Sequence, residues 1–391
     1  MRPWHWLVLW AVIAAVGLTR SLVTSLHPPH GTDLTLVVEW ADRWLWSGTS
    51  PYTGDWPRSN YPPWALVFLS PLTLVPPPWL PLVWGACSVI LASIGGVVAA
   101  RLAAPRPPGL IVALVTAMFL SWFAIRVGLR AGQFSVVSLV LGLAAVALAG
   151  RRPGLGGIAL GLSLTKLHVG GAFFLWALLT RRLRMASVAV ATMAAGAVVF
   201  SARLGESPLG TFSAYLAELV REFGGPAFHP GWVELRPLVH ALVPAAPVAE
   251  VVHLVLVAGT LVVALVVSAR ASGTPRERDL RVLGVCCGAT LIVTFHNPYD
   301  LVLLLPLMSV LGVTCSGLGA SDRRPLCGFF ALAQLLLVVD VPALAMGLDP
   351  SSRAAGLASG LAMLRHFDRL LVVATFVVAC RLALAPADRA T

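Results

Sequence analysis

Charged residues are scarce in this chain of 391 residues. Asp, Glu, Lys and Arg make up 12% of it, against about 25% in soluble domains, whereas hydrophobic residues make up 58% and the mean hydropathy is +0.85. This composition excludes a soluble globular enzyme, a disordered chain and a nucleic-acid-binding domain. The net charge of +11 is spread thinly between long apolar runs, which is typical of a multi-pass membrane protein whose basic loops contact anionic lipids.

Sequence motifs for nucleotides and metals are missing as well. The chain has no phosphate-binding Gly-Lys-Ser/Thr loop, no Gly-x-Gly-x-x-Gly fingerprint after a strand and no His-Glu-x-x-His. Its six cysteines lie in or beside apolar runs without Cys-x-x-Cys spacing, so we interpret them as buried apolar side chains rather than disulfides or metal ligands. We therefore expect no metal, no cofactor and no nucleotide at a soluble face.

The apolar runs predict an all-α polytopic membrane protein of about ten to thirteen segments, because a span needs about 20 residues. We find no internal repeat and expect one membrane domain over residues 1–391. Two runs differ from simple spans: Pro62–Val75 is short and contains Pro71, and Leu155–Leu179 has Lys166 and several glycines near its middle. Non-helical backbone at membrane depth is tolerated only where it lines a protein cavity, so both runs are predicted to be re-entrant or broken helices.

The arginine clusters predict the orientation of the chain. With the N-terminus inside and both broken segments re-entrant, every arginine cluster of a short loop lies in the cytoplasm, as the positive-inside rule requires. Two larger segments then lie outside, over residues 27–61 and 205–246. Apolar residues at helical spacing predict a membrane-surface helix in each. In the first it ends at Ser47-Gly48, and its apolar face is Leu34, Val37, Val38, Ala41, Trp44 and Leu45, opposite Glu39, Asp42 and Arg43. In the second the face is Leu209, Phe212, Leu216, Leu219 and Phe223.

Ionisable side chains inside the membrane are the sharpest functional signal in such a chain. Each costs at least about 2.5–3.5 kcal/mol at a helix centre, so it needs a reason to be there. In this topology several polar side chains gather in the outer half of the bilayer. They are Asp33, Arg126, Arg130, Gln133, Lys166, His168, His296 and Asp300.

Each of these residues has a structural and a functional interpretation. Asp33 is either the N-cap of the first outer helix or a carboxylate base at the membrane surface. Arg126, Arg130 and Gln133 are spaced to share one helix face. The two arginines either reach the interface along their aliphatic stems or clamp a lipid-linked phosphate.

Lys166 is the one lysine of the chain and lies far from either end of its apolar run. It either forms an internal salt bridge with Asp300 or Asp340, or contacts a phosphate at the tip of the broken helix beside His168.

Two aromatic-rich segments, Phe295–Asp300 and Asn60–Trp64, complete the set of candidates. His296 and Asp300 belong either to a polar turn or to a site in which His296 acts on a base, sugar or phosphate and Asp300 fixes its tautomer. Tyr61 is either an interfacial aromatic residue or a platform for a sugar ring.

Several short motifs, taken in order, resemble one known family. The motifs follow one another in this order: an early Asp, a Gly before Pro-Tyr, a Tyr-Pro-Pro, a Gly-Gln before a Leu-rich helix, a Gly-rich helix leading to Lys, and a late turn with His. They are Asp33, Gly48 with Pro51-Tyr52, Tyr61-Pro62-Pro63, Gly132-Gln133, Gly156-Gly157 with Lys166, and His296 with Asp300. This order is similar to glycosyltransferase family 87, the polyprenyl-phosphate-mannose-dependent α-mannosyltransferases of actinobacteria. The chain departs from that pattern after Lys166, where no Pro follows, and in the late turn, where Phe295 precedes His296.

The resemblance implies a GT-C fold and an inverting glycosyltransferase in the bacterial plasma membrane, with its site on the extracytoplasmic side. The implied donor is a polyprenyl-phosphate sugar, with mannose favoured, and the implied acceptor is a lipid or lipoglycan. Asp33 and His296 would be catalytic. The substrate-binding set would be Arg126, Arg130, Gln133, Lys166, His168, Tyr61 and Asp300. The alternative is a transporter or flippase of a lipid-linked sugar, since broken helices with charges at mid-depth also suit transporters.

Overall fold

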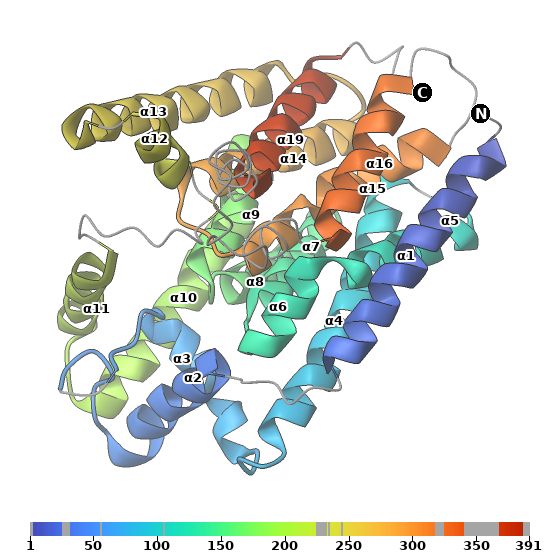
Figure 1. Ribbon diagram of the computed structural model, residues 1–391. Coiled ribbons are helices and arrows are strands. Elements are labelled where there is room, and N and C mark those ends of the chain that lie inside the picture. The colour runs from blue at the N-terminus through green and yellow to red at the C-terminus, as the bar shows by residue number, and fades with distance from the viewer. Residues whose placement is uncertain are drawn as a thin grey trace, which may run out of the picture. The chain divides into compact units, whose positions relative to one another are not determined.

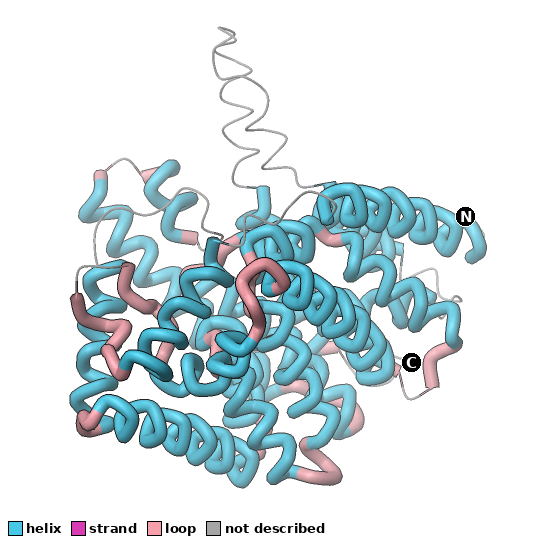
Figure 2. Tube along the Cα trace, turned by 90° about the horizontal axis from the view of Figure 1, so that it is seen from below, coloured by secondary structure: helices cyan, strands magenta, loops and turns pink. Residues whose placement is uncertain are grey.

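The structure is a computed structural model in which every described residue lies in a helix, a turn or a loop (Figures 1 and 2). It describes residues 3–25, 32–54, 57–104, 106–223, 233, 235–243, 245–316, 324–339 and 367–385. The chain forms two compact units. Unit 1 comprises Met1–Thr24, Gly96–Arg126 and His229–Thr391, and unit 2 comprises Ser25–Gly95 and Val127–Phe228.

Unit 2 is built around helices α7, α8 and α10. Helix α8 packs against both α7 and α10, and α3 packs on α10. Small residues along α8 allow this close packing, because Gly156, Gly157 and Gly161 face α7 or α10. The elements of this unit are α2 (Thr32–Asp42), the π-helix η1 (Arg43–Ser47), α3 (Pro63–Leu69), the 3-10 helix η2 (Ser70–Leu74), α7 (Ser135–Leu148), α8 (Pro153–Ser163), α9 (Leu167–Leu179), α10 (Leu183–Leu204) and α11 (Pro208–Phe223).

Unit 1 has α14 at its centre, packed against α13, α15 and α19 (Figure 1). Most side chains of α14 beyond its first turn are buried. The elements of this unit are α1 (Pro3–Ser25), α5 (Gly109–Ser121), α12 (Arg236–Leu242), α13 (Ala246–Arg270), α14 (Pro275–Val293), the 3-10 helix η3 (Pro298–Leu304), α15 (Leu305–Ser316), α16 (Arg324–Val339) and α19 (Phe367–Leu384). The boundaries between the units fall within α4 (Leu80–Ala103) and α6 (Phe123–Ala131).

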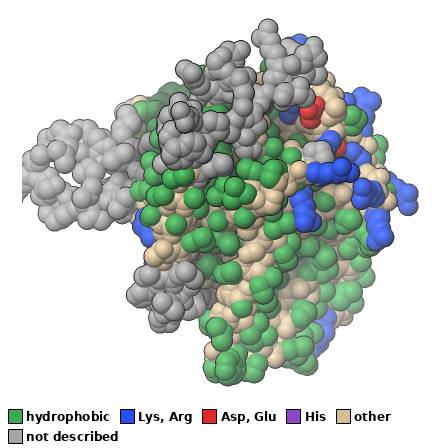
Figure 3. Space-filling view, turned by 90° about the vertical axis from the view of Figure 1, so that its right-hand side faces the viewer, with side chains coloured by type: hydrophobic (Ala, Val, Ile, Leu, Met, Phe, Trp, Pro, Cys, Tyr) green, Lys and Arg blue, Asp and Glu red, His purple; other side chains and the backbone are tan. Residues whose placement is uncertain are grey.

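Four helical segments among the described residues are long and apolar enough to cross a membrane, and a fifth is added if the bent pair α5 and α6 is one span. The four are Leu80–Ala103, Leu183–Leu204, Ala246–Arg270 and Pro298–Cys315. Six shorter apolar helices of 10–17 residues accompany them. Hydrophobic side chains cover much of the face in Figure 3, with Lys and Arg side chains gathered toward one side of it. The chain is therefore a multi-pass membrane protein, as its composition indicates.

The two runs predicted to be irregular are both interrupted. The Leu155–Leu179 run breaks after α8, and α9 begins again at Leu167, so Lys166 lies at the break. The Pro62–Val75 run forms the short α3 and then changes to the 3-10 helix η2 at Ser70, next to Pro71. A third break was not predicted: α5 and α6 are bent by 54° at Trp122.

The first outer helix has the predicted apolar face, but protein rather than lipid covers it. Leu34, Val37, Ala41 and Trp44 are buried in a cluster with aromatic and aliphatic side chains of α3, α10 and α11. The expected charged residues on the opposite face are exposed or half-buried. The π-helix η1 that continues α2 ends where expected, at Gly48, which has the left-handed φ of +63°.

The second outer helix, α11, presents its faces differently from the prediction. Its buried side chains are Thr211, Tyr215 and Glu218. Leu209 and Leu216 remain exposed, while Phe212 and Leu219 pack partly against the core of unit 2. The side chain of Phe223 and the turn chemistry expected after it lie outside the described residues.

Candidate functional site

Asp33 and Gln133, which are 100 residues apart in the sequence, meet in unit 2. The Nε2 amide group of Gln133 donates a hydrogen bond to Oδ2 of Asp33. Asp33 lies in the first turn of α2, one residue inside the helix, which begins at Thr32. The carboxylate is half-buried, and among the described residues no hydrogen bond reaches its Oδ1 atom. One oxygen of Asp33 is thus held while the other can accept a proton.

Gly132 brings Gln133 to this position. It has a φ of +73°, and a Cβ atom built on it would lie 2.4 Å from Cβ of Leu34, the residue after Asp33. Both the left-handed backbone and the contact with α2 therefore require glycine. The same conformation ends α6 at Ala131. The prediction that Arg126, Arg130 and Gln133 share one helix face is wrong for this reason, since Gln133 lies beyond the end of α6.

Lys166 joins the same polar cluster from the break between α8 and α9. Its Nζ atom lies 2.7 Å from Oε1 of Gln133 and 2.7 Å from Oγ of Ser135, and the side chain is buried. The irregular backbone at the break is itself held, because Nε1 of Trp64 donates a hydrogen bond to the carbonyl oxygen of Leu164 at 3.2 Å. Asp340, one of the partners considered for Lys166, lies outside the described residues.

The chemistry of these groups fixes the direction of the hydrogen bonds. An ammonium group only donates and a carboxylate only accepts, so the amide of Gln133 must turn its oxygen to Lys166 and its nitrogen to Asp33. The three side chains form a directed chain from cation to anion. Lys166 sets the direction of its hydrogen bonds, and the chain ends at the half-buried carboxylate of Asp33. We call Asp33, Gln133, Ser135 and Lys166 the Asp33 cluster.

Aromatic side chains pack against one another beside this cluster. The ring of Tyr61 makes an edge contact with Phe134, with 5.8 Å between their centroids, and lies 6.2 Å from the ring of Trp40. Phe134 is the neighbour of Gln133 in the chain and also contacts Trp84 at 4.4 Å. Tyr61 is half-buried, and the hydroxyl of Tyr52 donates to its carbonyl oxygen at 2.8 Å.

His168 lies half-buried in the first turn of α9, two residues after Lys166. Arg130 is exposed near the end of α6. Arg126 belongs to unit 1, where it is buried and its guanidinium group donates to the carbonyl oxygens of Ser121 at 2.7 Å and Val338 at 2.8 Å. Arg126 therefore satisfies helix C-terminal carbonyls, which favours the structural interpretation over a phosphate clamp.

His296 and Asp300 form a fully buried pair in unit 1. Nδ1 of His296 lies 3.5 Å from Oδ2 of Asp300, while Nε2 lies 2.8 Å from Oγ1 of Thr294 and 3.1 Å from the carbonyl oxygen of Thr290. The carboxylate of Asp300 also accepts the backbone N–H of Asn297 at 3.0 Å. His296 thus contacts the last turn of α14, Asp300 holds the backbone of the late turn, and neither side chain is exposed.

Comparison with known proteins assigns the chain to a family. The family model described as glycosyltransferase family 87 matches residues 60–295, which is more than half of the chain. The chain belongs to glycosyltransferase family 87. No curated protein and no solved structure matches it significantly.

Membership of glycosyltransferase family 87, a membrane family of the GT-C type, identifies the chain as a membrane glycosyltransferase that uses a sugar donor and an acceptor. The flippase alternative is not supported by this match. The matched range contains Tyr61, Gln133 and Lys166, whereas Asp33 and the late turn lie beyond its ends.

Sequence reasoning missed three groups of polar residues in this family 87 member. Ser135, which accepts from Lys166, is one polar residue at the start of an apolar helix and gave no periodic signal. On α11, buried Glu218 accepts hydrogen bonds from Arg221 and from Arg58. The hydrogen bonds from Arg221 hold the pKa of Glu218 below its usual value. The apolar pattern gave no signal for it, since Glu218 lies outside the expected apolar face.

The third missed group lies in unit 1. Glu250, near the start of α13, accepts a hydrogen bond from Nε of Arg236 at 2.8 Å, and Nε2 of His240 lies 2.9 Å from the same carboxylate oxygen. These contacts tie the short helix α12 to α13. Their spacing in the sequence has no period, which is why no pattern predicted them.

Proposed function

We propose that the chain is an inverting mannosyltransferase. It moves mannose from a polyprenyl-phosphate donor to a lipid or lipoglycan acceptor at the extracytoplasmic face of the bacterial plasma membrane. Two observations support a lipid-linked donor: the chain lacks motifs that bind soluble nucleotides, and its polar cluster is set among apolar helices. The observation that carries the proposal is the directed chain from Lys166 through Gln133 to Asp33.

Asp33 is the proposed general base. An acceptor hydroxyl attacks the anomeric carbon of the donor sugar, its proton passes to Oδ1 of Asp33, and the bond between that carbon and the phosphate oxygen breaks. The configuration inverts, so a β-linked donor gives an α-linked product. Gln133 holds Oδ2 and thereby directs Oδ1 toward the acceptor. Holding the base in a fixed geometry removes an orientational cost from the reaction.

The leaving group is a polyprenyl phosphate, whose negative charge grows as the bond breaks. Lys166 is the proposed source of compensating charge, with His168 and Arg130 as further ligands of the phosphate. A phosphate monoester leaves readily, so a base and a cationic environment suffice for this step. Tyr61, at the side of the Asp33 cluster, is the proposed platform for the sugar ring. His296 and Asp300 are buried, and we propose that they position the late turn rather than contact the donor.

The test is transfer from labelled polyprenyl-phosphate mannose to a bacterial lipid extract by membranes that contain the protein. Asp33→Asn keeps the shape of the side chain but removes the base, and we expect at least about a 10²-fold loss of transfer. The matched control is Asp42→Asn, because Asp42 lies exposed on the opposite side of the same helix. Equal turnover of Asp33→Asn and the wild type, at equal amounts of folded protein, would exclude Asp33 as the base.

A second arm of the experiment tests the sugar. The same membranes receive polyprenyl-phosphate glucose in place of the mannose donor. Labelling from mannose alone supports the proposed donor, and labelling from glucose alone contradicts it while leaving the reaction class intact. The labelled lipid, isolated from the mixture, identifies the acceptor.

A further inference from the structure

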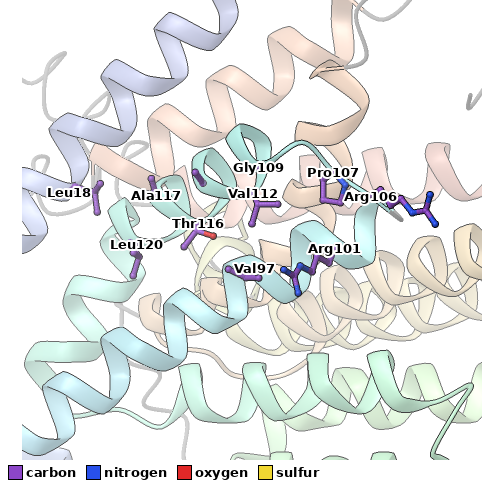
Figure 4. A pocket seen from close by; sticks show the side chains of 11 residues that line it. Leu18, Val97, Arg101, Arg106, Pro107, Gly109, Val112, Thr116, Ala117 and Leu120 are labelled. Carbon is purple, nitrogen blue, oxygen red and sulfur yellow. The ribbon is translucent and has the colours of Figure 1, made fainter.

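A cavity of about 590 Å³ lies in unit 1 between α1, α4 and α5, and none of its lining residues belongs to the proposed catalytic or substrate-binding set (Figure 4). Its volume falls within the range of about 300–1,000 Å³ that is typical of ligand sites. Its lining is mostly apolar. Arg101 and Arg106 lie at one end in Figure 4, and Leu18 and Leu120 lie at the other. We call it the α5 groove.

Two close helix crossings shape the α5 groove. A Cβ atom on Gly17 of α1 would lie 2.2 Å from Cβ of Ser121, and one on Gly96 of α4 would lie 2.7 Å from Cα of Thr116. Helix α5 is thus pressed against α1 near its end and against α4 near its middle. The groove lies beside these crossings and extends toward the N-terminus of α5 at Gly109.

The length of the groove matches one leaflet of a bilayer. Its lining follows α5 from Gly109 to Leu120, which at 1.5 Å per residue is about 16 Å. Half of a hydrocarbon core of about 30 Å is about 15 Å. The end with Arg101 and Arg106 coincides with the turn between α4, a candidate span, and α5. The charged end therefore lies at the level of lipid headgroups and the apolar end within one leaflet.

The charged end offers cations to an anion. Arg101 and Arg106 are exposed, and among the described residues no carboxylate or hydrogen-bond acceptor engages either guanidinium group. The carbonyl oxygens at the end of α4 do not compete for them. The guanidinium group of Arg276 donates to the carbonyl oxygens of Arg101 and Leu102.

The middle of the groove is lined by Thr116, whose hydroxyl group forms no hydrogen bond with any described residue. Oγ1 of Thr116 is buried. A buried hydroxyl without a partner is uncommon and costs free energy. This oxygen faces the crossing with Gly96 of α4 and has no exposed surface, so Thr116 lines the groove without offering a hydrogen bond to a ligand, and only the two arginines supply polar contacts.

We propose that the α5 groove binds one acyl chain of an anionic phospholipid from the surrounding bilayer. The phosphate lies between Arg101 and Arg106, and the acyl chain contacts Leu18, Ala117 and Leu120. A polyprenyl phosphate has the same headgroup chemistry, but its chain is branched at every isoprene unit and exceeds one leaflet in length, so it fits the groove less well. This site is independent of the proposed transfer reaction.

The test is a lipid titration of the full-length protein in detergent, followed by native mass spectrometry. The probes are phosphatidylglycerol, phosphatidylcholine and a polyprenyl phosphate. Wild-type protein is compared with the double variant R101Q/R106Q. The matched control is R151Q/R152Q, which removes two exposed arginines from the turn before α8. We expect one phosphatidylglycerol to bind the wild type and the control equally, and to bind R101Q/R106Q about 25-fold more weakly, at about fivefold for each arginine near a lipid headgroup.

Ala117→Trp gives a second test that leaves the charges unchanged. Ala117 lines the groove, and a Trp side chain would fill it. We expect this variant to lose phosphatidylglycerol as well. Three results would overturn the proposal: equal binding by R101Q/R106Q and the wild type, binding of phosphatidylcholine as tight as that of phosphatidylglycerol, or tighter binding of the polyprenyl phosphate than of phosphatidylglycerol. None of these readouts depends on transfer activity, so the proposed reaction can fail while the lipid site stands.

Discussion

The Asp33 cluster of unit 2 and the His296–Asp300 pair of unit 1 have similar signatures in the sequence but different surroundings in the structure. Each combines a carboxylate with a second polar side chain beside an apolar run. In the first, hydrogen bonds between side chains lead to a half-exposed carboxylate. In the second, both side chains are fully buried, and their contacts include the backbone of their own turn. A polar residue at membrane depth therefore indicates a required interaction, and only its exposure indicates whether a substrate can share it.

The largest expected effect on activity comes from Lys166→Met. This change removes the cation and leaves the amide of Gln133 without its donor, so both the proposed phosphate site and the orientation of Asp33 are lost. We expect kcat to fall by about 10²–10³-fold, as when one preorganised donor is removed. The apparent Tm in detergent should change little, because loss of a buried charge offsets loss of its hydrogen bonds. Transfer activity and Tm measured on the same preparation check both expectations. A large fall in Tm with normal turnover would assign Lys166 a structural role.

Asp300→Asn should give the opposite result. The amide cannot replace the carboxylate opposite His296, and breaking a buried pair costs about 3–5 kcal/mol. We expect a marked decrease in the apparent Tm, whereas the folded fraction should retain most of its transfer activity at low temperature. Thermal unfolding in detergent and turnover per folded molecule measure the two quantities. Full stability combined with lost turnover would return His296 and Asp300 to the substrate-binding set.

Glu218→Gln is expected to have the smallest effect and to depend on pH. Because Arg221 holds the pKa of Glu218 below its usual value of 4.5, the carboxylate stabilises the folded protein above that pH, and this contribution is lost as the pH falls through the lowered pKa. We expect the variant to lose about 1–2 kcal/mol at neutral pH and to converge with the wild type in acid. Unfolding measured from pH 7 downward checks this. Parallel curves at all pH values would show that the charge of Glu218 does not contribute.

Much of the fold follows from the sequence where one physical rule dominates. The period of apolar residues from Leu34 to Trp44 predicted α2, and the glycines around Lys166 predicted the break before α9. The bend at Trp122 could not be predicted, because no Pro or Gly marks it and the apolar run continues through it. Helix α11 was predicted, but its orientation was not. The pattern shows where apolar side chains recur, not whether buried Glu218 will find arginines as partners inside the protein.

The candidate site was predicted as a set of residues but not as an arrangement. Asp33, Gln133 and Lys166 were selected because polar side chains at that depth are costly, and their mutual contacts depend on helices far apart in the sequence. The error over Arg126, Arg130 and Gln133 has a single cause. Helical spacing was extended across Gly132, whose left-handed backbone ends the helix. A glycine directly before a candidate residue should therefore count against including that residue in the preceding helical face.

The amide at the centre of the Asp33 cluster has one more chemical consequence. A primary amide neither gains nor loses a proton in the ordinary pH range, so Gln133 couples Lys166 to Asp33 while keeping the two charges apart. Direct contact would let the ammonium neutralise the carboxylate and leave a salt, whereas an inert spacer preserves a basic oxygen and a positive field in the same small volume. In the proposed reaction, leaving-group departure and hydroxyl deprotonation need those two properties at the same moment, and this geometry would supply both without a mobile proton between them.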